Sequence, residues 1–362
     1  MAGGAGAVGQ TDWVARSAVS TPRLAITGFQ SESDPRAAID RSAAALTTVG
    51  VDGVNLQARG TKVGATDAAA RAQLARAHAD GLRAELLVGN FSERIDDFSE
   101  RLAHGLLKSP VRIRQIAETL SATVRQEGWN GISLDLESLQ ARDGAGLVSL
   151  VHALRDHLPA GDTVSVNVMN ETSLDEYRAA GYALPALGQA ASRLILMAYD
   201  QHGPWEPTPG PVGALAWQMA GLRALLSRVP ADRIDLGQAG YGYVWAPHHR
   251  TQLSDVAARQ LVTRAGEHPH WSSRAGEWTA DLPDRTTVWW SDTRSLALRE
   301  HLAAQRHLHG LAVWSLGLSD PIRGTDHHTN QRSDQGAAPR RQPHTRDRAP
   351  AGDPSGPPNS RP

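Results

Sequence analysis

Eight short runs rich in β-forming residues alternate with helix-like stretches along most of this chain, and this alternation strongly limits its fold. In the stretches 111–124 and 147–158, apolar residues recur at helical spacing. Strands that alternate with helices pair in parallel, and right-handed crossovers close eight such units into a barrel. We therefore expect an α/β fold, a (β/α)8 TIM barrel, with strands at 24–29, 51–56, 84–90, 131–137, 163–168, 194–199, 234–241 and 311–316.

The gap between the seventh and eighth of these strands is too long for a single helix. It contains a helical pattern at 253–265 and a hairpin-like run at 271–290. A small α+β insertion is therefore expected at about 246–290.

The two ends of the chain differ in composition from its middle. Residues 326–362 contain no Val, Ile, Leu, Met, Phe, Trp or Tyr, so they cannot bury enough apolar surface to offset the entropy of ordering. A GxGxxG pattern at 4–9 follows no strand, and we interpret it as part of a flexible leader. The sequence thus predicts a leader at 1–21, a barrel domain at 22–325 and a disordered tail rich in Pro and Arg at 326–362.

Charge and cysteine content exclude several classes of partner and chemistry. With 37 Lys and Arg against 38 Asp and Glu, the chain has no overall charge that favours nucleic acid or an anionic membrane. It has no cysteine, which excludes disulfide scaffolds, thiolate metal sites and thiol nucleophiles. No HExxH spacing, signal peptide or apolar run of membrane-spanning length is visible. We expect no metal, no other cofactor and no membrane span.

Two carboxylates end the fourth predicted strand, on the side of a barrel that carries its chemistry. Period-two geometry over 131–137 places Ser133, Asp135 and Glu137 on one face and apolar residues on the other. Because the apolar face packs on the helices, the carboxylates point into the barrel. Burial of two neighbouring carboxylates raises the pKa of at least one, and a carboxyl group that stays protonated is what a general acid needs.

The motifs of this chain resemble those of glycoside hydrolase family 18, the chitinase-like barrels, and within it the branch of spore-cortex and peptidoglycan hydrolases. The run 130–137 is similar to the family's DGxDxDxE, with Asn130 and Ser133 in place of its first two acidic residues. The run 197–200 resembles the family's MxYD, 209–212 resembles the PGPV of the peptidoglycan branch, and Trp314 resembles the tryptophan that ends strand eight.

The resemblance implies a retaining hydrolase of β-1,4 linkages in a glycan that contains N-acetylglucosamine, either peptidoglycan or chitin-like, in which the sugar's own acetamide attacks. It implies that Glu137 is the acid and base, that Asp135 orients the acetamide and stabilises the cation, and that Tyr199 bonds the acetamide carbonyl. Neutral Ser133 is expected to tune this activity, and Asn130 is expected to be a turn residue. The same motifs imply substrate contacts for Asp200, Met197 and Trp314.

Further polar and aromatic residues lie near predicted strand ends. Asn90 and Asn167 are candidate contacts for sugar hydroxyls, with capping or turn chemistry as the alternative. Trp205 and Trp245 are candidate stacking platforms, with packing of the insertion as the alternative. The excess of Trp (10) over Phe (3) is typical of flat apolar surfaces with polar edges, as in sugar sites.

Two other functions are compatible with the sequence. One is a catalytically silent, glycan-binding barrel related to chitinases. The other is a barrel enzyme of unrelated chemistry, for example a lyase, that uses Asp135 and Glu137. We expect a monomer whose partner is the glycan. The substrate class suggests an extracellular or cell-wall location, which the sequence leaves undetermined.

Overall fold

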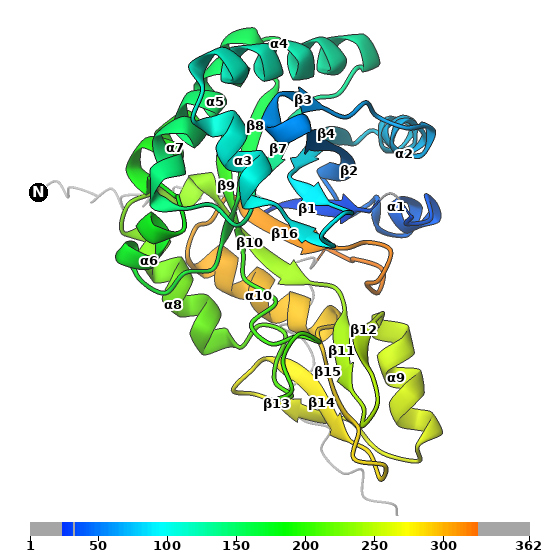
Figure 1. The fold of residues 1–362 in the computed structure, drawn as a ribbon. Helices are drawn as coiled ribbons and strands as arrows, with labels where there is room; N and C mark the ends of the chain where they lie inside the picture. Colours follow the sequence, from blue (N-terminus) through cyan, green and yellow to red (C-terminus); the bar gives the residue numbers. More distant parts are fainter. Residues whose placement is uncertain (1–23, 32, 325–362) are drawn as a thin grey trace, which may run out of the picture. The chain divides into compact units, whose positions relative to one another are not determined.

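The structure is a computed structural model that describes residues 24–31 and 33–324 (Figure 1). The expected leader at 1–21 and tail at 326–362 lie outside the described residues. Eight parallel strands close into a barrel because β1 pairs with both β16 and β2, which confirms the predicted (β/α)8 fold. In chain order the barrel strands are β1 (Ala25–Gln30), β2 (Thr48–Gln57), β4 (Arg83–Gly89), β7 (Gly131–Asp135), β8 (Thr163–Met169), β9 (Arg193–Met197), β10 (Ile234–Ala239) and β16 (Gly310–Trp314).

Helices surround the barrel (Figure 1). They are α1 (Ala37–Ser42), α2 (Ala68–Ala79), α3 (Glu100–Leu107), α4 (Pro110–Glu127), α5 (Gly144–His157), α6 (Leu174–Ala179), α7 (Leu184–Ala190), α8 (Leu215–Leu226) and α10 (Thr293–Gln305). Short 3-10 turns lie at Ala58–Gly60 (η1), Ala141–Asp143 and Ala231–Arg233, and short strands at Lys62–Val63 (β3), Phe91–Ser92 (β5) and Asp97–Phe98 (β6). In the described part of the chain, no helix is both long and apolar enough to cross a bilayer.

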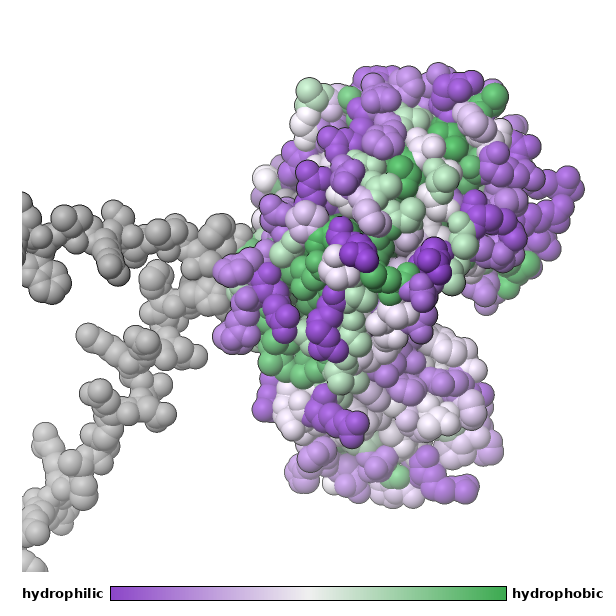
Figure 2. Space-filling view, turned by 90° about the vertical axis from the view of Figure 1, so that its left-hand side faces the viewer, coloured by the Kyte–Doolittle hydropathy of each residue, from purple (hydrophilic) through white to green (hydrophobic). Residues whose placement is uncertain are grey.

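Helix α4 shows why the sequence folds into these elements. The Ser109 side chain accepts a hydrogen bond from the Arg112 N–H, and Pro110 follows it at the first helical position. Gly128 ends the helix in the left-handed conformation, with φ of 89°. Of the apolar residues that recur at helical spacing between these caps, Ile113, Ile116, Leu120 and Val124 are buried, whereas Val111 in the first turn is 53% exposed. Figure 2 shows mostly hydrophilic residues over the outer surface of the barrel.

The interior of the barrel is built in layers of inward-facing side chains. A middle layer is apolar and contains Phe29, Leu87, Ile195 and Ala312. Two residues earlier on β4 and β9, Glu85 and Arg193 face the same interior nearer the amino ends of the strands. The apolar layer therefore separates a charged base from the carboxyl ends of the strands.

The charged base is a fully bonded ion network. Arg193 donates to both carboxylate oxygens of Glu85, each at 2.8 Å, and to Asp235 Oδ2 at 2.8 Å. The other oxygen of Asp235 lies 2.6 Å from His309 Nδ1. Glu85 also accepts from Thr163 and Ser165. Attraction to Arg193 and these hydrogen bonds outweigh burial and lower the pKa of Glu85.

The expected insertion between the seventh and eighth barrel strands is a five-stranded antiparallel sheet packed against α9 (Asp255–Arg264) (Figure 1). It begins at Gly242, earlier than the expected 246, because residues 242–245 pair with the insertion and not with the barrel. Its strands are β11 (Gly242–Trp245), β12 (Arg250–Leu253), β13 (His270–Ser272), β14 (Glu277–Asp281) and β15 (Thr287–Trp290).

A buried carboxylate ties the insertion to the loop after β9. Glu277 of β14 accepts hydrogen bonds from the backbone N–H groups of Val212 at 2.8 Å and Gly213 at 2.9 Å. Arg299 of α10 is completely buried beside it and donates to the Gly213 carbonyl at 2.8 Å. The end of the PGPV stretch, at Val212, is thus held by Glu277, and the next residue, Gly213, is held by both Glu277 and Arg299.

Candidate active site

A cavity of about 350 Å³ lies at the carboxyl ends of the barrel strands. Seven of the residues that the sequence marked as site candidates line it: Asp135, Glu137, Asn167, Met197, Tyr199, Asp200 and Trp314. They come from β7, β8, β9 and β16 or directly follow these strands. Residues far apart in the chain therefore meet in one space because parallel strands end on the same side.

Asp135, the last residue of β7, and Glu137, two residues later, are buried carboxyl groups of the cavity whose pKa values are raised. Burial raises the pKa of Asp135, which is only 7% exposed. Burial also raises the pKa of Glu137, and the charges of Asp135 and Asp200 raise it further. Because a hydrogen bond from Asn167 favours the ionised form of Asp135, while neighbouring negative charges disfavour the ionised form of Glu137, a proton shared by the pair is favoured on Glu137. No group of three His, Asp or Glu side chains that could hold a metal ion occurs among the described residues.

Asn167 connects Ser133 to Asp135. The Ser133 hydroxyl donates to Asn167 Oδ1 at 3.3 Å, and a hydrogen bond from the Asn167 side chain to Asp135 lowers the pKa of that carboxyl against the effect of burial. The Oδ1 atom of Asp135 is buried and has no hydrogen-bond partner among the described residues. Asn167 is thus placed to orient Asp135, and one carboxylate oxygen of Asp135 is left for a donor.

Asn90 supports the backbone of Glu137. Its side-chain oxygen accepts from the Glu137 N–H at 2.9 Å, and its amide donates to the Glu137 carbonyl at 2.9 Å and to the Ser99 carbonyl at 3.0 Å. Asn90 is completely buried and does not line the cavity. Because both ends of the amide are engaged by backbone groups, this placement favours the capping or turn alternative over a sugar contact.

Asp200 is held at the rim by two tyrosines that follow β10. The hydroxyls of Tyr241 and Tyr243 donate to Asp200 Oδ1 at 2.5 and 2.7 Å. Burial raises the pKa of Asp200, although these hydrogen bonds oppose the shift. Asp200 has a left-handed φ of 62°, and the Tyr199 ring contacts Tyr241 edge-on at 6.4 Å. The motif 197–200 is therefore braced by residues at the start of the insertion.

The three candidate tryptophans have different surroundings. Trp314 lines the cavity and packs on Phe29, with ring centroids 5.8 Å apart. Trp205 is 63% exposed outside the cavity and contacts Tyr243 edge-on. Trp245 is only 4% exposed, and its indole N–H donates to the Glu206 carbonyl at 3.1 Å. Trp245 belongs to a cluster of buried residues, which favours the alternative of packing over a stacking role.

Sequence reasoning missed six cavity residues, of which Leu87 and Gly89 belong to the apolar strand β4. Asp52 and Asn55 come from β2, where the pairing with β4 shifts register between Asp52 and Val54 and breaks the alternation of side chains. Phe91 and Phe98 lie on β5 and β6, which are only two residues long. The one available signal was the pair of polar residues inside an otherwise apolar strand run at 48–56.

Comparisons of the sequence and of the structure with known proteins point to the same group of glycan-acting proteins. The family model Glycosyl hydrolases family 18 matches residues 72–319. The uncharacterized glycosylase YvbX of Bacillus subtilis (strain 168) is 22% identical over 255 residues, covering 68% of this chain and 74% of YvbX. The cortical fragment-lytic enzyme of the same organism is 26% identical over 245 residues, covering 62% of this chain but 55% of the enzyme, so the chain spans about half of that relative. A chitinase structure from Chromobacterium violaceum ATCC 12472 has a TM-score of 0.74 and 28% identity, covering 82% of this chain and 95% of the chitinase.

Proposed function

Because the chain belongs to glycosyl hydrolase family 18, and is therefore a hydrolase of glycosides, we propose that it cleaves β-1,4 linkages in a glycan that contains N-acetylglucosamine. The observation that carries this proposal is the buried pair Asp135 and Glu137: burial raises the pKa of both carboxyl groups, and Asp135 Oδ1 has no hydrogen-bond partner among the described residues. A glycosidic bond needs a proton donor at its leaving oxygen and a negative charge beside the developing cation.

In the first step Glu137 donates its proton to the glycosidic oxygen, and the bond between this oxygen and the sugar's anomeric carbon breaks. The carbonyl oxygen of the sugar's 2-acetamide attacks the same carbon and forms a cyclic oxazolinium ion. Asp135 accepts a hydrogen bond from the acetamide N–H on its unpartnered oxygen, and its negative charge stabilises the cation.

In the second step Glu137, now ionised, takes a proton from a water molecule that attacks the anomeric carbon. The acetamide leaves, and the sugar keeps its β configuration after two inversions. Tyr199 donates its hydroxyl hydrogen to the acetamide carbonyl oxygen. Burial and the surrounding carboxylates raise the pKa of Tyr199 well above its usual value, so this hydroxyl stays a donor.

The stereochemistry of the product tests this mechanism. With an N-acetylglucosamine oligomer as substrate, we expect NMR spectra recorded directly after mixing to show new reducing ends in the β form, before mutarotation produces the α form. An α product or an unsaturated sugar contradicts the mechanism. Binding of the oligomer with no hydrolysis identifies instead the silent glycan-binding barrel, for which the neutral Ser133 in the motif is the relevant observation.

The pH dependence of hydrolysis follows from the two raised pKa values. Glu137 must be protonated to act as acid, so activity persists as pH rises above the ordinary carboxyl range and falls only through its raised pKa. Asp135 must be ionised, so activity falls on the acid side at a pH above the usual Asp value. We expect both limbs of the kcat/KM profile to be displaced upward.

A single exposed charge provides a check of this assignment. The charge of Asp97 raises the pKa of Glu137 as the smallest contributor. Asp97→Asn should therefore move the alkaline limb slightly toward lower pH and leave the acid limb in place. Movement of the alkaline limb toward higher pH would show that Glu137 is not the group titrating there.

A further inference from the structure

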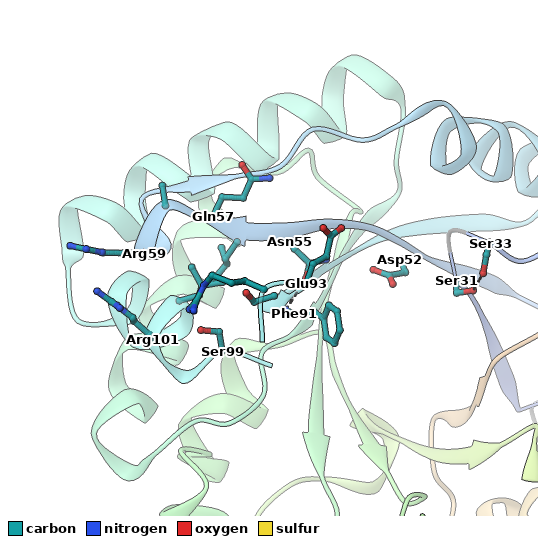
Figure 3. A pocket seen from close by; sticks show the side chains of 15 residues that line it. Ser31, Ser33, Asp52, Asn55, Gln57, Arg59, Phe91, Glu93, Ser99 and Arg101 are labelled. Atoms are coloured by element: carbon teal, nitrogen blue, oxygen red, sulfur yellow. Dashed lines mark hydrogen bonds between the residues drawn. The ribbon is translucent and has the colours of Figure 1, made fainter. Parts of the chain in front are cut away.

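A second and larger cavity, of about 790 Å³, adjoins the catalytic cavity (Figure 3). The two share Asp52, Asn55 and Phe91 as lining residues, so they form one continuous depression. We call the larger one the side groove. It lies over the segments that follow β2 and β4, and none of the candidate residues proposed for bond cleavage lines it.

The side groove has different side chains at its two ends. Figure 3 shows Arg59 and Arg101 reaching out together at one end, and Ser31, Ser33 and Asp52 at the other. A third guanidinium, that of Arg94, also lines the groove. In the same view Glu93, Asn55 and Phe91 lie between these two ends. Positive charge therefore gathers at the end distant from the shared residues.

Two glycines bring the arginines together. Arg59 belongs to η1 and has a left-handed φ of 59°, while Arg101 belongs to α3. A Cβ on Gly60 would come within 2.4 Å of the Leu102 carbonyl oxygen, and a Cβ on Gly105 within 2.1 Å of the Arg59 carbonyl oxygen. The backbones of η1 and α3 can approach this closely only because these residues lack side chains.

The side chains of Arg59 and Arg101 are exposed and have no hydrogen-bond or ion-pair partner among the described residues. Neighbouring arginines differ in this respect. Arg142 pairs with Glu100, and Arg112 donates to the Gly105 carbonyl at 2.6 Å. Two unpaired guanidinium groups at the end of a large cavity suit a planar anion, because each can bind a carboxylate through two parallel hydrogen bonds.

We propose that the side groove binds a carboxylate carried by the glycan, such as the lactyl ether or peptide branch of a peptidoglycan strand, through Arg59 and Arg101. This inference rests on the proposed function and specifies its substrate as an anionic glycan. A neutral chitin chain offers these arginines hydrogen-bond acceptors but no negative charge to pair with them. The carboxylate-bearing sugar lies in the side groove while the bond to be cleaved lies beside Glu137.

The test compares two forms of one peptidoglycan glycan fragment, with its carboxylates free or converted to amides. We expect wild-type kcat/KM to be about 10- to 100-fold higher for the free form, which is the range for hydrogen bonds to charged groups. In the double variant Arg59→Gln and Arg101→Gln the ratio should fall to about one. Arg228→Gln, an exposed change outside both cavities, should keep the wild-type ratio.

Binding separates failure of this inference from failure of the proposed function. If the wild-type chain hydrolyses neither form, the proposed function fails. The preference for the free carboxylate form is then measured as the ratio of the calorimetric Kd values of the two forms. Added salt should lower the wild-type ratio, since screening weakens exposed ionic contacts. Equal kcat/KM and equal Kd for the two forms in the wild-type chain overturn the inference whether or not the double variant folds. A folded double variant that keeps the wild-type preference for the free form also overturns the inference.

Discussion

Replacing Glu137 with Gln should lower kcat for an N-acetylglucosamine oligomer by about 10²- to 10⁴-fold, the usual contribution of a general acid and base. The substitution keeps the size of the side chain and removes the proton that the leaving oxygen requires. Because protonated Glu137 and Gln are both neutral, the substitution leaves the charge of the cavity unchanged, and the oligomer should still bind. Release of reducing ends measures the rate, and calorimetry with the same oligomer measures binding.

Glu118→Gln is the matched control because Glu118 is an exposed residue of α4. It should keep the wild-type rate. Full activity in Glu137→Gln would assign proton donation to another group. A wild-type chain that binds the oligomer and never cleaves it would instead support the silent barrel.

Replacing Arg193 with Met should reduce the free energy of unfolding by about 3–5 kcal/mol, the range for removing one partner of a buried ion pair. The substitution leaves the carboxylates of Glu85 and Asp235 buried at 1% and 0% exposure without their shared cation. Their ionised forms then lack the attraction that offsets burial. Urea unfolding monitored by tryptophan fluorescence measures the change.

Arg178→Met provides the control for loss of an arginine ion pair at the surface. Arg178 and Asp175 are 76% and 85% exposed, so losing their contact should change stability by less than about 1 kcal/mol. A comparably small change in Arg193→Met would mean that water replaces the guanidinium at the base of the barrel. If the slope of the unfolding free energy against urea concentration is the same in the wild-type chain and both variants, the differences in midpoint report stability alone.

Much of the fold follows from local pattern. Each barrel strand is a short apolar run, and helices such as α4 carry their own capping residues, so alternation along the chain was enough to predict the barrel. The inward orientation of Asp135 was also predictable, because period-two alternation determines which face of a strand a residue occupies.

The departures come from contacts that sequence spacing does not encode. The side-chain amide of Asn90 is of a type that can bind sugar hydroxyls, yet it forms hydrogen bonds with the backbone of Glu137, 47 residues away. Trp245 is buried in contact with Tyr243 and the Glu206 carbonyl, and its position in the sequence does not predict those neighbours. The insertion starts early because β11 finds its hydrogen-bond partners in β15, beyond the reach of local propensity.

The buried Glu277 has a consequence for how such barrels can be recombined. Its carboxylate receives the N–H groups of Val212 and Gly213, in the loop that also follows Asp200. The insertion is therefore not a cassette that can be exchanged alone between related barrels. A chimera that takes residues 242–290 from a relative should also take 200–213 and the position of Arg299, since these segments share one set of buried hydrogen bonds. The insertion and the segment 200–213 at the rim of the candidate active site should therefore be exchanged together.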